Sequence, residues 1–136
     1  MTAFKKNVLS ESQVEERIKE YLANETQLYE DWYQGDQYQL GSHIQLYGPS
    51  PPIEFLKVKF KEWVDKNKTQ LKEEICLKWK YSTKKDNGPI TLLIIAVIAD
   101  CLTPLFKDAP NLIAMGTALV VGNFLDEICI DESVAI

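Results

Sequence analysis

The side chains that carry most enzyme chemistry are scarce in this sequence of 136 residues, which has one histidine and three cysteines. His43 follows Ser42, and such a pair would allow a general base to activate a hydroxyl nucleophile, but no catalytic motif surrounds it. The sequence contains no phosphate-binding glycine loop, nucleophile elbow or zinc-protease motif. We therefore expect no catalytic residues, no metal and no cofactor, and interpret His43 as a loop histidine with a hydrogen-bond partner.

The cysteines Cys76, Cys101 and Cys129 lie more than twenty residues apart and form no C-x-x-C pair. This spacing excludes a zinc ribbon and a thioredoxin-type motif. Apolar neighbours favour three buried, reduced thiols that act as small hydrophobic side chains. The odd number of cysteines and the start of the sequence, which does not resemble a secretory leader, predict a cytoplasmic protein.

Asp100 is the ionisable residue of most interest, because it lies within a long apolar run. A carboxylate desolvated in such surroundings is a candidate buried functional group. The alternative is a carboxylate that pairs with a lysine of residues 53–80 or reaches solvent. Asp126 and Glu127 lie near the end of the last expected helix, where negative charge opposes the helix dipole. Their position predicts contact with a cation, such as a lysine of residues 57–72.

The sequence is acidic overall, with a net charge of −5, but its charge is segregated. Residues 1–52 carry 4 basic and 8 acidic side chains, residues 53–86 carry 10 and 6, and residues 87–136 carry 1 and 6. The overall acidity disfavours nucleic acid as a partner. The basic segment either faces acidic parts of the chain or forms an electrostatic contact surface. The predicted residues of that surface are Lys57, Lys61, Lys68 and Lys72.

Aromatic and acidic residues occur together in the N-terminal third. Tyrosine and tryptophan are favoured interface anchors, so this patch suits a basic partner, and the basic helix of a second copy is one candidate. The alternative is a loop that its aromatic rings hold against the core. The predicted contact residues are Trp32, Tyr33, Tyr38 and Tyr47.

Apolar residues recur at helical spacing through most of the chain, and the expected helices cover residues 12–33, 53–80, 89–103 and 110–129. The apolar stripe of the helix over 53–80 is interrupted at Asn67, and this helix is expected to be the central scaffold. Residues 34–52 are rich in proline and glycine and form either a loop or a small hairpin, of which the loop is favoured because an isolated hairpin is marginal.

The whole chain is expected to be a single all-α domain, a compact bundle of about four helices. Residues 1–9 would form an arm, residues 10–52 an N-terminal helix with its loop, and residues 53–136 the helical core.

The two apolar segments within residues 90–125 allow either a buried core or a membrane hairpin. The first is about 21 Å long before Pro104, shorter than the ~30 Å hydrocarbon core of a membrane, and it contains the costly Asp100. A buried core is therefore favoured, a membrane-active hairpin that inserts residues 90–125 is the main alternative, and an exposed apolar face that forms an oligomer is a third. Small residues at spacing four predict a close helix-packing or oligomer edge. These residues are Ala114, Ala118 and Gly122.

Three short motifs lie in the last sixty residues: Ile75-Cys76-x-x-Trp79, then Ile98-Ala99-Asp100-x-Leu102, then Ala118-Leu119 with Leu125 and Cys129 after it. In this order they resemble small, uncharacterised helical modules encoded beside bacterial defence and signalling effectors. The resemblance covers less than half of the chain and implies an all-α accessory module without chemistry of its own. With the residue patterns, it predicts a non-enzymatic protein-interaction module of adaptor, regulatory or immunity type, which binds a protein partner or itself. An enzyme that uses Asp100 or His43 is the weakest alternative.

Overall fold

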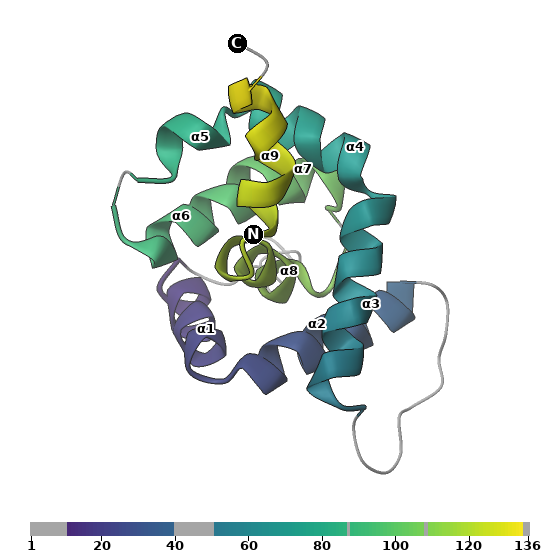
Figure 1. Cartoon of the computed structure of the whole chain (residues 1–136). Coiled ribbons are helices and arrows are strands. Elements are labelled where there is room, and N and C mark those ends of the chain that lie inside the picture. Colours follow the sequence, from purple (N-terminus) through teal and green to yellow (C-terminus); the bar gives the residue numbers. More distant parts are fainter. Residues whose placement is uncertain (1–10, 40–50, 87, 108, 135–136) are drawn as a thin grey trace.

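The computed structural model describes residues 11–39, 51–86, 88–107 and 109–134. Within these ranges every regular element is helical (Figure 1), which confirms the predicted all-α fold class. The expected arm over 1–9 and the choice between loop and hairpin within 40–50 lie outside the described residues.

The chain is divided into more and shorter helices than the sequence suggests, so an arrangement of about four helices in a bundle is not confirmed. In chain order the elements are α1 (Glu11–Ala23), α2 (Glu25–Gln39), α3 (Ile53–Lys66), α4 (Lys68–Leu71), the π-helical segment η2 (Lys72–Lys78), α5 (Tyr81–Lys84), α6 (Ile90–Val97), the π-helical segment η3 (Ile98–Leu102), α7 (Thr103–Leu105), α8 (Leu112–Val121) and α9 (Phe124–Val134).

Asparagines occupy the junctions at which expected helices are divided. The Oδ1 atom of Asn24 accepts a hydrogen bond from the backbone N–H of Gln27 at 3.1 Å, which caps the start of α2. The prediction of one helix over 12–33 is therefore wrong. The expected helix over 110–129 is divided in the same way at Asn123, whose backbone is left-handed with φ 64°.

Asn67 ends α3, at the position where the apolar stripe is interrupted. Its Nδ2 atom donates a hydrogen bond to the carbonyl of Trp63 at 2.9 Å, and the chain continues as α4 and η2. At the other end of α3, the extended backbone of Pro52 leaves its carbonyl free to accept the first helical N–H bonds, from Phe55 and Leu56. The prediction of one helix over 53–80 is therefore wrong, because the chain is helical as far as Lys78 but is divided at Asn67.

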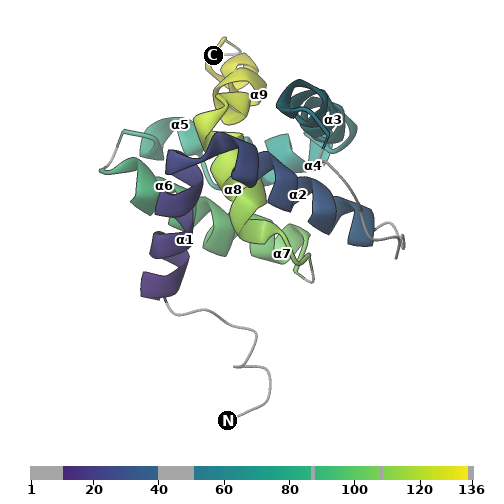
Figure 2. The same ribbon diagram turned by 90° about the horizontal axis from the view of Figure 1, so that it is seen from below.

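The centre of the fold is α8, and the prediction that residues 53–80 form the central scaffold is wrong. Helices α1, α2, α6 and α9 and the segment η3 all contact α8, which they enclose (Figures 1 and 2). Every residue from Ala114 to Val120 is buried. A helix that is apolar on all sides belongs in such a position. The expectation of a buried core is therefore confirmed for the second apolar segment.

The first apolar segment is less well covered. Its buried residues Ile94, Val97 and Leu102 face the common core, whereas Ile90 and Leu92 on α6 are 44% and 49% exposed. No helix among the described residues has the length and apolar composition needed to cross a membrane.

Candidate functional site

An aromatic cluster joins α2 to α3 and places Trp32 in the core. The ring of Trp32 meets that of Phe60 edge-to-face at 4.9 Å between centroids, and Phe60 stacks on Trp63 at 5.5 Å. Trp32 is only 1% exposed. The prediction that Trp32 is a surface contact residue is therefore wrong, because its ring anchors α2 to the core.

The outer side of α3 carries apolar side chains that the core does not cover. Phe55 is 42% exposed and Val58 is 55% exposed. The ring of Tyr33 meets that of Phe55 edge-to-face at 6.2 Å, and the Lys59 ammonium lies 5.5 Å from the Phe55 ring centroid. Of the predicted aromatic contact residues, Tyr33 is thus half-buried beside an exposed ring. The structure describes neither the side chain of Tyr38 nor any part of Tyr47.

Exposed lysines lie further along α3 and α4, with the exposed acidic residues Glu62 and Asp65 between them. Lys61, Lys66 and Lys68 are exposed and form no ion pair with any residue that the structure describes. We define the α3–α4 surface as Phe55, Val58, Lys61, Lys66 and Lys68. It combines two apolar side chains with three cationic ones.

The other predicted surface lysines have partners within the chain. Lys57 lies 2.9 Å from the carboxylate of Glu25 and 5.8 Å from the centroid of the Tyr29 ring. Lys72 is half-buried and also interacts within the chain. Lys57 of the basic segment therefore faces an acidic residue of the N-terminal third.

Asp100 is exposed, as the alternative for this residue expected, so the hypothesis of a buried functional carboxylate is wrong. The indole Nε1–H of Trp79 donates a hydrogen bond to Oδ2 of Asp100 at 3.0 Å. The Lys84 ammonium lies 4.4 Å from the Trp79 ring centroid and donates to the Trp79 carbonyl at 2.6 Å. These contacts fix Trp79 between η3 and α5. Among the described residues there is no group of three or more histidine, cysteine, aspartate or glutamate side chains placed to bind a metal ion.

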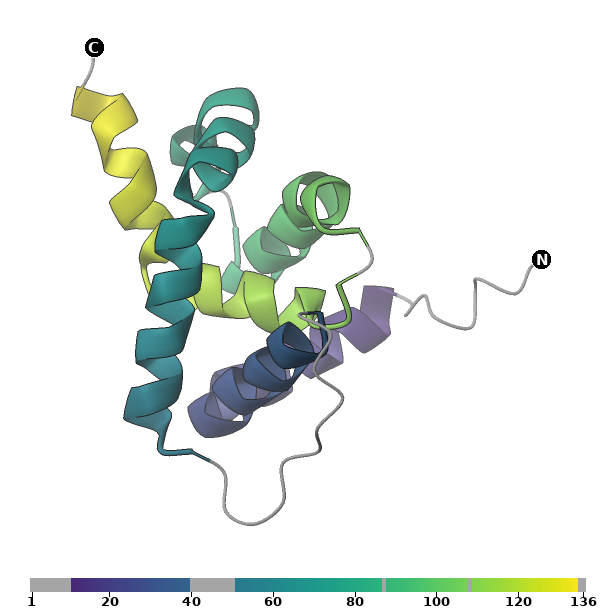
Figure 3. The same cartoon turned by 90° about the vertical axis from the view of Figure 1, so that its right-hand side faces the viewer.

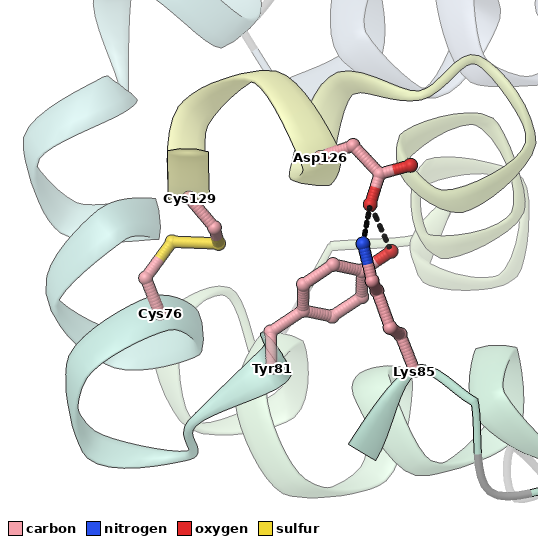
Figure 4. A network of polar contacts seen from close by, with 5 residues as sticks. All are labelled: Cys76, Tyr81, Lys85, Asp126 and Cys129. Carbon is pink, nitrogen blue, oxygen red and sulfur yellow. Dashed lines mark hydrogen bonds and ion pairs between the residues drawn. A yellow bond between two sulfur atoms is a disulfide. The ribbon is translucent and has the colours of Figure 1, made fainter. Parts of the chain in front are cut away.

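A disulfide joins Cys76 on η2 to Cys129 on α9, with their Cα atoms 5.3 Å apart (Figure 4). The expectation of three reduced thiols is therefore wrong for this pair, because the fold brings together residues separated by 53 positions. Cys101 remains a free, buried thiol. Burial, together with the negative charge of Glu74, raises its pKa to about 12.

Asp126 is held beside this disulfide by two donors. Its Oδ1 atom accepts hydrogen bonds from the Tyr81 hydroxyl at 3.1 Å and from the Lys85 ammonium at 3.3 Å (Figure 4). The predicted cationic partner of Asp126 exists, but it is Lys85, which directly follows α5, and not a lysine of residues 57–72. Asp126 lies in the first turn of α9 and not near the end of a helix, as was expected. Burial raises the pKa of Tyr81, and the adjacent Asp126 charge raises it further, so its hydroxyl remains a donor.

The small-residue edge of α8 is covered by the protein's own chain. Ala114 and Ala118 are fully buried, and Gly122 is half-buried against Phe124. The edge thus supports helix packing within one chain. The alternative, an edge that forms an oligomer, would have required these residues to be exposed. Gly116 also allows a close approach, because a Cβ there would overlap the Ile98 side chain.

Sequence reasoning missed Phe55 and Val58. Both fall outside the helical row formed by the buried residues Leu56, Phe60 and Val64, and their position around the helix was the available signal.

His43, interpreted from the sequence as a loop histidine, lies outside the described residues. Comparisons with protein-family models, with curated proteins and with solved structures find no match to this chain.

Proposed function

We propose that this chain is a non-enzymatic protein-interaction module and that its partner contacts the α3–α4 surface. The observation that carries the proposal is the exposure of Phe55 and Val58 on a helix whose opposite side is fully packed. Exposed aromatic and aliphatic side chains anchor protein interfaces when polar residues surround them. The half-buried Tyr33 ring contacts the Phe55 ring edge-to-face, and this contact holds the Phe55 side chain in place before binding.

The chemistry of the surface favours an acidic protein as the partner. Residues 53–71 carry five lysines and three acidic residues, on a chain whose net charge is −5. Because Lys61, Lys66 and Lys68 lack ion-pair partners among the described residues, carboxylates of a second protein would complement them. The resemblance to modules beside bacterial defence effectors is the basis for an adaptor, regulatory or immunity-type role. The cytoplasmic location stays a prediction.

The other hypotheses receive less support. Insertion of residues 90–125 into a membrane would require α8 to leave the core that it centres. An enzyme would require a reactive carboxylate or histidine in a suitable environment, whereas Asp100 is exposed and already bound to Trp79.

Site-specific photocrosslinking tests the proposal. A photoreactive residue in place of Val58 should capture a defined protein in native lysate, whereas the same residue in place of the exposed Glu16 on α1 should not. In the protein that carries the photoreactive residue at position 58, Lys61→Glu with Lys68→Glu should reduce capture at least tenfold. Lys61→Arg with Lys68→Arg should preserve capture. Helical circular dichroism serves as the folding control.

Sedimentation of the purified protein distinguishes the two kinds of partner. Self-association that the charge-reversed variant abolishes would identify a second copy as the partner. Equal capture at positions 58 and 16, together with a purified monomer, would contradict the proposal.

A further inference from the structure

Helix α9 is attached to the rest of the chain by a covalent bond and a polar clamp on the same side. Asp126 and Cys129 are three residues apart, so their side chains share one face of the helix. This face lies against η2 and α5, where it meets Cys76, Tyr81 and Lys85 (Figure 4). Figure 3 shows α9 extending from one end of α8 beside the chain segment that leads from α3 into η2. These contacts secure one face of α9 to η2 and to the region of α5.

The joint at the start of α9 is suited to movement of the helix as a unit. Asn123 is exposed and adopts a left-handed backbone, which separates α9 from α8. Beyond the joint, the Phe124 ring meets Phe60 edge-to-face at 5.0 Å, and the side chains of Leu125 and Ile128 are buried. A helix of 11 residues is marginal once it is detached from such contacts. By contrast, α1, α2 and α6 contact α8, and neither cysteine of the disulfide lies on them.

We propose that the Cys76–Cys129 disulfide is a redox latch: when the bond is reduced, α9 separates from η2 and α5 while the helices around α8 remain folded. The proposal does not depend on the α3–α4 surface. It links the conformation of the chain to its surroundings, because disulfides persist in oxidising compartments and are reduced in the cytosol.

The reaction requires a dithiol reductant. A thiolate of the reductant attacks one sulfur of the Cys76–Cys129 bond, which forms a mixed disulfide and releases the other cysteine as a thiolate. The second thiol of the reductant then displaces the remaining cysteine. Two electrons and two protons are transferred, so the protein gains two thiols and the reductant becomes a disulfide.

Access to the sulfur atoms depends on α9 opening first. Cys76 and Cys129 are 0% and 2% exposed, so a reductant cannot reach them while α9 is docked. The clamp on Asp126 opposes this opening. We therefore expect Asp126 to control the rate of reduction, although it forms no part of the disulfide itself.

The test is hydrogen–deuterium exchange of the full chain before and after treatment with dithiothreitol. Exchange in residues 124–134 should accelerate at least tenfold after reduction, while α1, α2 and α8 change less than twofold. Cys76→Ala with Cys129→Ala should show the fast exchange without reductant. Cys101→Ala should leave exchange slow before reduction and should respond to dithiothreitol as the natural chain does. Asp126→Asn should increase the rate of reduction about fivefold, because weaker contacts with Tyr81 and Lys85 would lower the free energy of opening α9 by roughly 1 kcal/mol.

Alkylation under denaturing conditions provides the independent readout. Without reductant it should label one cysteine, and after reduction it should label all three. Three labelled cysteines before reduction would overturn the proposal, as would unchanged exchange in α9 after complete reduction. Equal loss of protection in every helix would overturn it as well, because the chain would then unfold globally. Should the double alanine variant fail to fold, reduction of the natural chain still decides between these outcomes.

Discussion

The Asn111 side chain donates a hydrogen bond from Nδ2 to the backbone carbonyl of Trp32 at 2.8 Å, across 79 positions of sequence. The bond joins the start of α8 to α2, and Asn111 is 6% exposed. Asn111→Ala should lower the free energy of unfolding by about 1–3 kcal/mol, since it removes a buried donor and packing atoms. Urea unfolding measures the change. Asn67→Ala is the matched control, because its equivalent bond to Trp63 is only part-buried and should matter less. Equal effects of the two variants would contradict this account.

Gly35 on α2 permits the approach that forms this bond. A Cβ at position 35 would lie 2.5 Å from the Cβ of Asn111, which cannot move away without shifting the backbone of its own helix. Gly35→Ala should therefore destabilise the protein by about 1–3 kcal/mol through overpacking, although alanine favours helices by ~1 kcal/mol. Gln34→Ala, an exposed neighbour on the same helix, should change stability by less than about 0.5 kcal/mol. A stabilising Gly35→Ala variant would show that α2 is free to shift.

Loss of the disulfide should have a large thermodynamic effect. The bond joins residues 53 positions apart, and closing a loop of that length in the unfolded chain corresponds to about 4 kcal/mol in the chain-entropy model. Cys76→Ala with Cys129→Ala should lower the urea-derived free energy of unfolding by roughly that amount. In the presence of dithiothreitol the natural chain and this variant should differ by no more than about 1 kcal/mol. A large difference that persists under reduction would assign the effect to packing.

Lys80 is a site for stabilisation. Its backbone is left-handed, with φ 63°, which costs a residue with a side chain about 1–2 kcal/mol. Lys80→Gly should raise the midpoint of thermal unfolding, with a net gain of about 0.5–1 kcal/mol after the entropy of glycine is counted. The opposite result is expected for Glu16→Gly within α1, which should cost about 1 kcal/mol. A lower midpoint for Lys80→Gly would mean that the Lys80 side chain stabilises the fold by more than the left-handed backbone destabilises it.

Alkaline pH should destabilise the fold through buried tyrosines. Burial is the main cause that raises the pKa of Tyr21 to about 12, and it raises that of Tyr29 to about 12 as well. An unfolded tyrosine ionises near pH 10, so between about pH 10 and 12 the unfolded chain binds fewer protons than the folded one. Stability is therefore complete below pH 10 and falls by about 1.4 kcal/mol per pH unit for each such group. Urea unfolding from pH 8 to 12 measures this slope.

The matched variant for the alkaline effect is Tyr29→Phe. It keeps the ring contact with Phe60 and removes one titrating hydroxyl. Its stability should fall less steeply above pH 10 than that of the natural chain. Identical slopes would remove Tyr29 from the explanation.

Much of the helical content could be predicted from residue spacing, whereas the junctions were not predicted. The apolar row is interrupted at Asn67, but one helix was expected across this position. The breaks at Asn24 and Asn123 were missed, because apolar residues continue at helical spacing across both. Asparagine favours caps and left-handed backbone, and that preference was the signal available at both positions.

The sequence by itself determined that the chain is helical and that its most apolar segment lies inside, because periodicity and transfer from water are properties of local residue types. Only the tertiary structure decided which polar and reactive groups meet. In the structure Trp32 is buried, Asp100 and Val58 are exposed, and a disulfide joins Cys76 to Cys129. The physical reason is that these outcomes depend on the crossing of helices far apart in sequence. A shift of one residue in helical phase, or a bend at one asparagine, turns a side chain from the core to solvent.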